Sequence, residues 1–185
     1  LFPVVSYRDS RTDAAEKEVA RLLPQSVLYS KTGIQKQNFN TVYQLYCDKI
    51  SGKLDNARHF LMIPDYLSFK LTGVIKNEYT NATTTNIVNA VTKTWDDEIL
   101  STLGIPKYIF SELSLPSTEG GDFTKELQHK VGFNAKVVLC PSHDTASAVA
   151  ACPIDDESVY ISSGTWSLIG TENTAPILSK KELAA

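Results

Sequence analysis

Apolar residues recur at helical spacing through most of the first hundred positions of the chain. From Thr12 to Leu23 they form one stripe, which predicts an amphipathic helix, and Pro24 ends it because proline cannot continue a helix. Gly73 and Gly104 each follow another apolar stripe, at the point where glycine commonly caps a helix. The spacing therefore predicts three further helices, over residues 41–50, 60–71 and 95–103, the last of them capped by Thr94.

The pattern changes in the last third of the chain, where short β-branched runs follow one another. Residues 145–151 are small and helix-forming, and Pro153 closes that helix. Strands are predicted on both sides of this helix and also at the start of the chain, over residues 2–7, 136–140, 158–162 and 166–169.

Two intermediate segments have weaker patterns. Residues 74–85 alternate and then become rich in asparagine and threonine, which indicates a strand that leads into a polar turn. Residues 115–122 contain one proline and two glycines and are predicted to form a loop. Because helices alternate with strands early and paired strands follow late, the order of elements indicates a layered α/β fold with a mixed sheet and flanking helices.

Composition narrows the possible functions. The 185 residues carry a net charge of −3 and have no long basic run, so a nucleic-acid partner is not expected. No apolar run approaches the length of about 20 residues that crosses a bilayer, so no membrane partner is expected either. Cys47 and Cys140 lie in apolar surroundings and, with Cys152, form no C-x-x-C pair, which predicts buried thiols and a cytoplasmic protein.

The run Ser142-His143-Asp144 contains the residue types of a hydrolase triad. Consecutive side chains point in different directions and cannot form a proton relay, so this interpretation fails. His59 and His129 lie in unrelated segments, and no protein metal site is predicted.

Asp144 lies between a predicted strand and a predicted helix, at the rim of an α/β sheet where ligands bind. The positive end of the helix favours the ionised carboxylate, which can accept the proton of a substrate hydroxyl. The alternative is that Asp144 serves only as the helix N-cap. Both interpretations stay open on these residues alone.

The run Ser162-Ser163-Gly164-Thr165 joins two predicted strands. Backbone N–H groups and hydroxyls of such a turn can face a phosphate, and glycine allows the close approach that this needs. Turns of this composition are common, but Thr165 follows Asp144 by only 21 residues. The two features together indicate phosphoryl transfer.

Several runs of the chain closely resemble rhamnulokinases of the FGGY carbohydrate kinase family, over nearly its whole length. The runs that carry the resemblance are VVSYRDSRT, FLMIPDYLSFKLTG, EYTNATTT, HDTASAVAACP and VYISSGTWSLIGTE. The resemblance implies an actin-like ATPase (ribonuclease H-like) fold and transfer of the γ-phosphoryl group of ATP to L-rhamnulose, with magnesium. The sugar and ATP are then the expected partners.

Site residues follow from the same resemblance. Asp144 corresponds to the catalytic base, which also binds the sugar, and His143 and Thr145 flank that sugar. Gly164 and Thr165 correspond to contacts with the nucleotide phosphates.

Three other residues are weaker candidates. Arg8 and Asp9 occupy a position where related kinases place polar substrate contacts, although a surface ion pair with a neighbour such as Arg11 is equally compatible. Asp65 has the pattern of a helix-surface or capping residue.

The resemblance also implies a domain organisation. Residues 1–140 correspond to the latter part of an N-terminal sugar-binding lobe, and 141–185 to the catalytic segment and the opening of a nucleotide-binding lobe. The D-x-G-type phosphate hairpin and the adenine-binding segment of the family have no counterpart here, so the chain is expected to be an incomplete, inactive piece of a kinase. A kinase for another ketose or polyol, such as xylulose or glycerol, and a non-catalytic actin-like module that binds a sugar or a partner are the alternatives.

Overall fold

The computed structural model describes residues 5–7, 9–155, 157–164 and 167–179. The chain divides into two compact units, and each contains segments that are distant in sequence. Unit 1 consists of Leu1–Phe60, Thr83–Ser111 and Ile177–Ala185. Unit 2 consists of Leu61–Ala82 and Glu112–Pro176.

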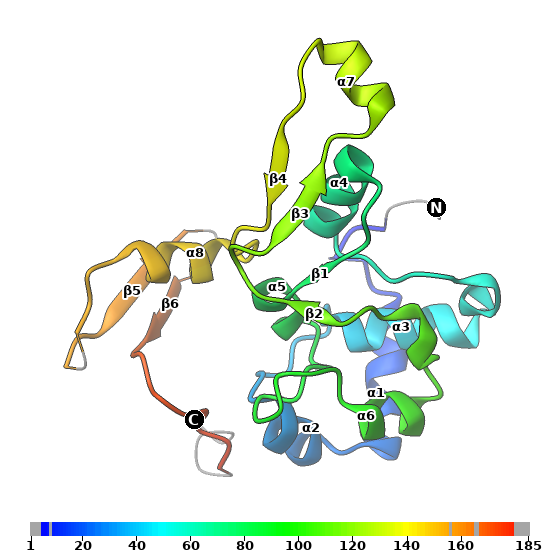
Figure 1. Ribbon diagram of the computed structural model, residues 1–185. Coiled ribbons are helices and arrows are strands. Elements are labelled where there is room, and N and C mark those ends of the chain that lie inside the picture. The colour runs from blue at the N-terminus through cyan, green and yellow to red at the C-terminus, as the bar shows by residue number, and fades with distance from the viewer. Residues whose placement is uncertain (1–4, 8, 156, 165–166, 180–185) are drawn as a thin grey trace. The chain divides into compact units, whose positions relative to one another are not determined.

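Unit 1 is helical in its described part. Helices α1 and α3 contact each other, and α1 also contacts α6, around a core in which Val19, Val42 and Ile99 are fully buried. Figure 1 shows these three helices lying together. The helical elements of the unit are α1 (Thr12–Leu22), α2 (Gln25–Thr32), α3 (Thr41–Ile50), η1 (Lys53–Asn56), α6 (Asp97–Leu103) and η2 (Lys107–Ile109).

Helix α6 begins differently from the prediction. Asp96, not Thr94, is the N-cap residue, and its carboxylate accepts hydrogen bonds from the backbone N–H groups of Glu98 and Ile99. At the other end, Gly104 caps the helix with a φ of 63°, a left-handed conformation that glycine adopts without steric cost. The predicted end of the helix is therefore confirmed and its predicted start is wrong by two residues.

Unit 2 contains three two-stranded sheets among its described residues. Strand β1 pairs with β2 in parallel, whereas β3 pairs with β4 and β5 with β6 in antiparallel fashion. Helix α4 packs on β3 and β4, and α8 packs on β5 (Figure 1). The elements are α4 (Ile63–Thr72), β1 (Asn77–Glu78), α5 (Tyr79–Thr83, whose last residue belongs to unit 1), β2 (Leu113–Ser114), β3 (Glu119–Asp122), α7 (Lys125–Val131), β4 (Lys136–Val138), α8 (Asp144–Ala151), β5 (Tyr160–Ser163) and β6 (Ser167–Gly170).

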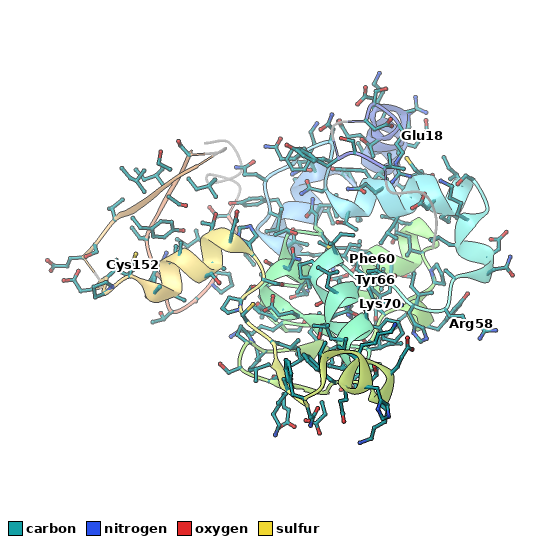
Figure 2. All side chains as sticks on the ribbon, turned by 90° about the horizontal axis from the view of Figure 1, so that it is seen from above. Glu18, Arg58, Phe60, Tyr66, Lys70 and Cys152 are labelled. Atoms are coloured by element: carbon teal, nitrogen blue, oxygen red, sulfur yellow. The ribbon has the colours of Figure 1, made fainter. Side chains whose placement is uncertain are left out.

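Helix α4 begins at Ile63, three residues later than predicted, and Gly73 caps its C-terminus in the left-handed conformation. Figure 2 shows Tyr66 and Lys70 on this helix. Because Pro64 lies in its first turn, where a missing backbone N–H costs nothing, the sequence fits this start.

Two other segments contradict the predictions. The stretch 74–85 contributes only the two residues of β1 and then turns into the short helix α5. The predicted loop 115–122 ends in strand β3, which bulges between Glu119 and Gly121. A Cβ at Gly120 would lie 3.3 Å from both the carbonyl oxygen and a side-chain carbon of Val137, so glycine here allows the two strands to approach closely.

The remaining differences are smaller. Helices α2 and α7 have no predicted counterpart. Half of the predicted strand over 2–7 lies outside the described residues, and its described half, residues 5–7, forms no strand. Cys140 is exposed, contrary to the prediction of a buried thiol, and Cys47 is only partly buried. In the part of the chain that the structure describes, no helix has the length and apolar character needed to span a bilayer.

The packing of unit 1 predicts that Ile99→Ala lowers the free energy of unfolding by about 2–5 kcal/mol, because it removes a fully buried side chain and leaves a cavity. The matched control is Ile50→Ala, the same chemical change at the end of α3, where the side chain is 61% exposed. Its expected cost is about 0.5 kcal/mol or less. Urea unfolding followed by circular dichroism measures both, and equal losses would contradict the assigned core.

Candidate active site

Asp144 is the first residue of α8 and follows the strand β4 by a short connection, as the sequence predicts. The N-cap, however, is His143, whose Nδ1 accepts a hydrogen bond from the backbone N–H of Ala146 at 3.2 Å. The capping function that competed with catalysis for Asp144 thus belongs to its neighbour. Asp144 is free of that task.

The carboxylate of Asp144 is fully exposed. Its Oδ1 accepts the backbone N–H of Thr145 at 2.7 Å, and the hydroxyl of the same residue lies at 3.5 Å. The first turn of α8 presents positive partial charge beside this carboxylate. An ionised, exposed carboxylate at a helix start can accept a proton from a bound hydroxyl.

The imidazole of His143 lies beside this carboxylate, with Nδ1 at 3.8 Å from Oδ1 of Asp144. Because Nδ1 accepts the N–H of Ala146, it carries no proton, and the two residues do not form an ion pair. The hydrogen bond instead assigns the proton of the neutral ring to Nε2. His143 therefore offers a hydrogen-bond donor next to the acceptor of Asp144.

The connection that precedes α8 is held by a buried carboxylate, that of Glu78, which is only 1% exposed. One of its oxygens, Oε2, accepts both the backbone N–H of Ser142 at 3.0 Å and the hydroxyl of that residue at 2.7 Å. The hydroxyl of Thr80 donates to the same oxygen at 2.6 Å, and its backbone N–H donates to Oε1 at 2.7 Å. The N–H of Asn81 adds a fifth bond at 3.1 Å.

These bonds determine the charge state of Glu78. Burial alone raises its pKa, and this is the largest single effect, but the donors of Thr80 and Ser142 together outweigh it and lower the pKa below the ordinary value of 4.5. Hydrogen bonds to a carboxylate stabilise its ionised form. Glu78 is thus a buried anion neutralised by dipoles.

A second buried carboxylate, Asp65, supports the first. It lies in the first turn of α4, is 2% exposed, and accepts the backbone N–H of Glu78 at 3.0 Å and the side-chain amide of Asn77 at 3.3 Å. Burial raises the pKa of Asp65, and the hydrogen bonds from Glu78, Asn77 and the backbone of Met62 oppose that rise. Of the two predicted roles, helix-surface or capping, the surface position is wrong because Asp65 is buried, whereas its hydrogen bond from the backbone of Met62, the N-cap residue of α4, fits a capping role.

The hairpin of β5 and β6 provides the predicted strand-to-strand turn. Ser163 pairs with Ser167, so Gly164 begins the three-residue connection between the strands. Thr165 lies outside the described residues, and the predicted proximity of Thr165 to Asp144 stays a prediction. The hairpin contacts α8 through β5. Figure 2 labels Cys152, the residue that follows this helix.

The remaining candidates belong to unit 1. Arg8 lies outside the described residues. Asp9 accepts the backbone N–H of Arg11 at 2.8 Å, and the guanidinium of Arg11 pairs with Asp48 at 2.8 Å. Asp9 thus makes a local turn ahead of α1 rather than a side-chain ion pair with Arg11.

Sequence reasoning missed Glu78 and its partner Ser142. The signal that was available is an acidic residue directly before a run of hydroxyl and amide side chains, in EYTNATTT, and a serine two positions before Asp144. Such runs supply donors that can neutralise a buried carboxylate.

The model of the FGGY family of carbohydrate kinases, N-terminal domain, matches residues 1–151. The chain belongs to the FGGY family.

Relatives with curated names support this family assignment. The chain is 50% identical over 185 residues to a rhamnulokinase of Halalkalibacterium halodurans, covering 99% of this chain and 40% of the relative. It is equally identical to a rhamnulokinase of Oceanobacillus iheyensis, of which it covers 39%. The chain therefore spans about two fifths of the length of these curated relatives.

Solved FGGY structures confirm the fold. The chain superimposes on a ligand-bound xylulose kinase from Lactobacillus acidophilus with a TM-score of 0.84 at 24% identity, covering 96% of this chain and 37% of the other. A xylulose kinase from Rhodospirillum rubrum gives a TM-score of 0.76 at 17% identity, covering 87% of this chain and 34% of the other. The predicted actin-like fold is thereby established.

The lowered pKa of Glu78 predicts a pH-dependent stability difference between the wild type and Glu78→Gln. A depressed pKa contributes stability that is present above the unfolded value, here 4.5, and is lost as the pH falls through the folded value. The wild type is therefore more stable than the variant at neutral pH, and the difference shrinks as the pH falls below about 4.5. Urea unfolding at several pH values measures this difference, and a gap independent of pH would contradict an ionised Glu78.

Proposed function

We propose that the protein to which this chain belongs is an ATP-dependent sugar kinase that transfers the γ-phosphoryl group of ATP to a hydroxyl of L-rhamnulose. The supporting observation is the exposed Asp144 carboxylate at the start of α8, in a family member that is 50% identical to two rhamnulokinases. An FGGY member without a free carboxylate at a helix start would lack an obvious proton acceptor.

Asp144 is the general base of this proposal. It accepts the proton of the attacking sugar hydroxyl while the oxygen bonds to the γ-phosphorus and the bond from phosphorus to the bridging oxygen of ADP breaks. The Nε2 proton of His143 is available to hold a neighbouring sugar oxygen, which fixes the hydroxyl in the direction of the base. Thr145 flanks the sugar from the next position of the helix.

Other contacts are assigned in the same way. Gly164 and Thr165 are assigned to the nucleotide phosphates as the resemblance implies, and the predicted sugar contacts of Arg8 and Asp9 stay a prediction. In the described part of the chain, no three His, Cys, Asp or Glu side chains gather around one point. Magnesium is commonly held by phosphates with one or two carboxylates, so we assign its delivery to the nucleotide.

The 185-residue stretch by itself is expected to give no turnover. It spans about 40% of the length of the rhamnulokinases that it resembles, and phosphoryl transfer depends on groups that position both substrates. The activity experiments therefore use the full-length protein.

A second candidate is a kinase for xylulose. The observation in its favour is the TM-score of 0.84 with a xylulose kinase, although the identity is only 24%. Because sugar identity depends on a few contacts, the shared fold does not choose between these sugars.

Replacing the base tests the mechanism. Asp144→Asn lowers kcat by about 10²–10⁴-fold, because an amide cannot accept the proton, while nucleotide binding persists. The matched control is Asp97→Asn, since Asp97 is also exposed and is also the first residue of a helix, α6. Coupled ADP release measures kcat, and an Asp144→Asn enzyme that keeps more than about a tenth of it would remove Asp144 from the mechanism.

Substrate choice is tested separately with a panel of L-rhamnulose, xylulose and glycerol. We expect the highest kcat/KM with L-rhamnulose, measured by sugar-dependent ADP release from the full-length protein. A preference for xylulose or glycerol would leave the kinase assignment intact and overturn the substrate. Failure with every sugar of the panel and with further ketoses would favour a non-catalytic module.

A further inference from the structure

We infer that Glu78 is a positioning residue that fixes the orientation of Asp144 by anchoring the connection before α8. This inference rests on the proposed role of Asp144 as a base. It concerns a residue that touches neither the sugar nor the nucleotide in that proposal. The hydrogen-bond partners of Glu78 described above, Asp65, Thr80, Asn81 and Ser142, all lie within unit 2.

The geometry connects the two residues through very little chain. Ser142 is bound to Glu78 by both its backbone N–H and its hydroxyl, and Asp144 follows two positions later. The backbone N–H of His143 points to the hydroxyl of Thr80 at 3.4 Å, and that hydroxyl itself donates to Glu78. Two successive backbone groups ahead of Asp144 are thus fixed by one buried cluster.

The far side of the connection is fixed as well. The hydroxyl of Ser147 donates to the carbonyl of Pro141 at 2.6 Å, and its backbone N–H donates to the carbonyl of His143 at 3.0 Å. With both sides held, the first turn of α8 has one orientation with respect to Glu78. Catalytic groups need to be held within about 0.5 Å of their productive geometry.

The side chain at position 78 is also well suited to this task. Among the described residues, no lysine, arginine or histidine forms an ion pair with Glu78, and its charge is met by five donors. A buried carboxylate without hydrogen-bond donors raises the free energy of the folded protein. If the connection before α8 moved away, Glu78 would lose some of its donors while it stayed buried, so its charge opposes that movement. Asp65 holds the backbone of Glu78 from α4 and completes the support.

Three variants of the full-length protein test this inference. Glu78→Ala removes all five hydrogen bonds, and Ser142→Ala removes only the hydroxyl bond. Glu78→Gln retains the four bonds to the Oε2 position when its amide oxygen occupies that position, and it loses the bond from the backbone N–H of Thr80 to Oε1. The matched control is Asp96→Ala. Asp96 is also a buried carboxylate that accepts backbone N–H groups, as the cap of α6 in unit 1, but unlike Glu78 it also pairs with a lysine, Lys31.

Two measurements are made on each variant. The first is kcat and KM for sugar and ATP, together with the pH dependence of kcat, normalised to the folded fraction. We expect Glu78→Ala to lower kcat at least tenfold with KM for ATP unchanged, and the apparent pKa of the base in the kcat profile to stay as in the wild type. Ser142→Ala is expected to have a smaller effect in the same direction, and Glu78→Gln to recover most of the activity. Asp96→Ala lowers stability and leaves kcat per folded molecule unchanged.

The second measurement does not depend on activity. Hydrogen exchange of the backbone amides of residues 142–147 is expected to accelerate at least tenfold in Glu78→Ala and measurably in Ser142→Ala, and not in Asp96→Ala. Unchanged exchange in these residues would overturn the inference, whatever the enzyme does. So would normal kcat per folded molecule in Glu78→Ala alongside an inactive Asp144→Asn.

The two proposals fail in different ways. An active Asp144→Asn enzyme refutes the base, and the exchange data still decide whether Glu78 anchors the connection. If Glu78→Ala does not fold, Ser142→Ala carries the test, because it removes one hydrogen bond to Glu78 and leaves the other four in place.

Discussion

A buried negative charge neutralised by hydrogen-bond donors, rather than by a cation, is the constraint on which the candidate site depends. Glu78 collects backbone and hydroxyl donors from the helix α5 that follows it and from Ser142, and these bonds lower its pKa against the effect of burial. Hydrogen bonds have strict directions, whereas an ion pair tolerates many arrangements. The cluster therefore specifies where the chain before α8 can lie, and with it where Asp144 projects.

The fold could be predicted from the sequence wherever local pattern and tertiary structure agree. Helix α3 was predicted with its observed bounds because its apolar stripe and its burial coincide, and Gly73 and Gly104 marked helix ends because only glycine adopts their left-handed conformation freely. Gly120 of β3 misled the prediction, since it serves the close approach of Val137 and not a turn. Family resemblance, rather than periodicity, supplied the actin-like fold.

The site was predicted only in part, for a similar reason. Asp144 could be found because a strand, a carboxylate and a helix follow one another locally. The capping role of His143 was missed, because capping by an imidazole nitrogen has no strong sequence signature. Glu78 could not be assigned, because its role exists only when Ser142 reaches it from another part of the chain.

Glu78 and Ser142 are 64 positions apart in the sequence, and one segment of unit 1, Thr83–Ser111, is encoded between them. At a synthesis rate of about 5–20 residues per second, roughly 3–13 s pass on the ribosome between the appearance of the carboxylate and that of its partner. During that interval the Glu78 carboxylate is hydrated, because the donors of Ser142 are not yet available to it. Closure of so long a loop is also entropically slow. The candidate site is therefore expected to become ordered after the helices of unit 1, all of which precede Ser142 in the sequence.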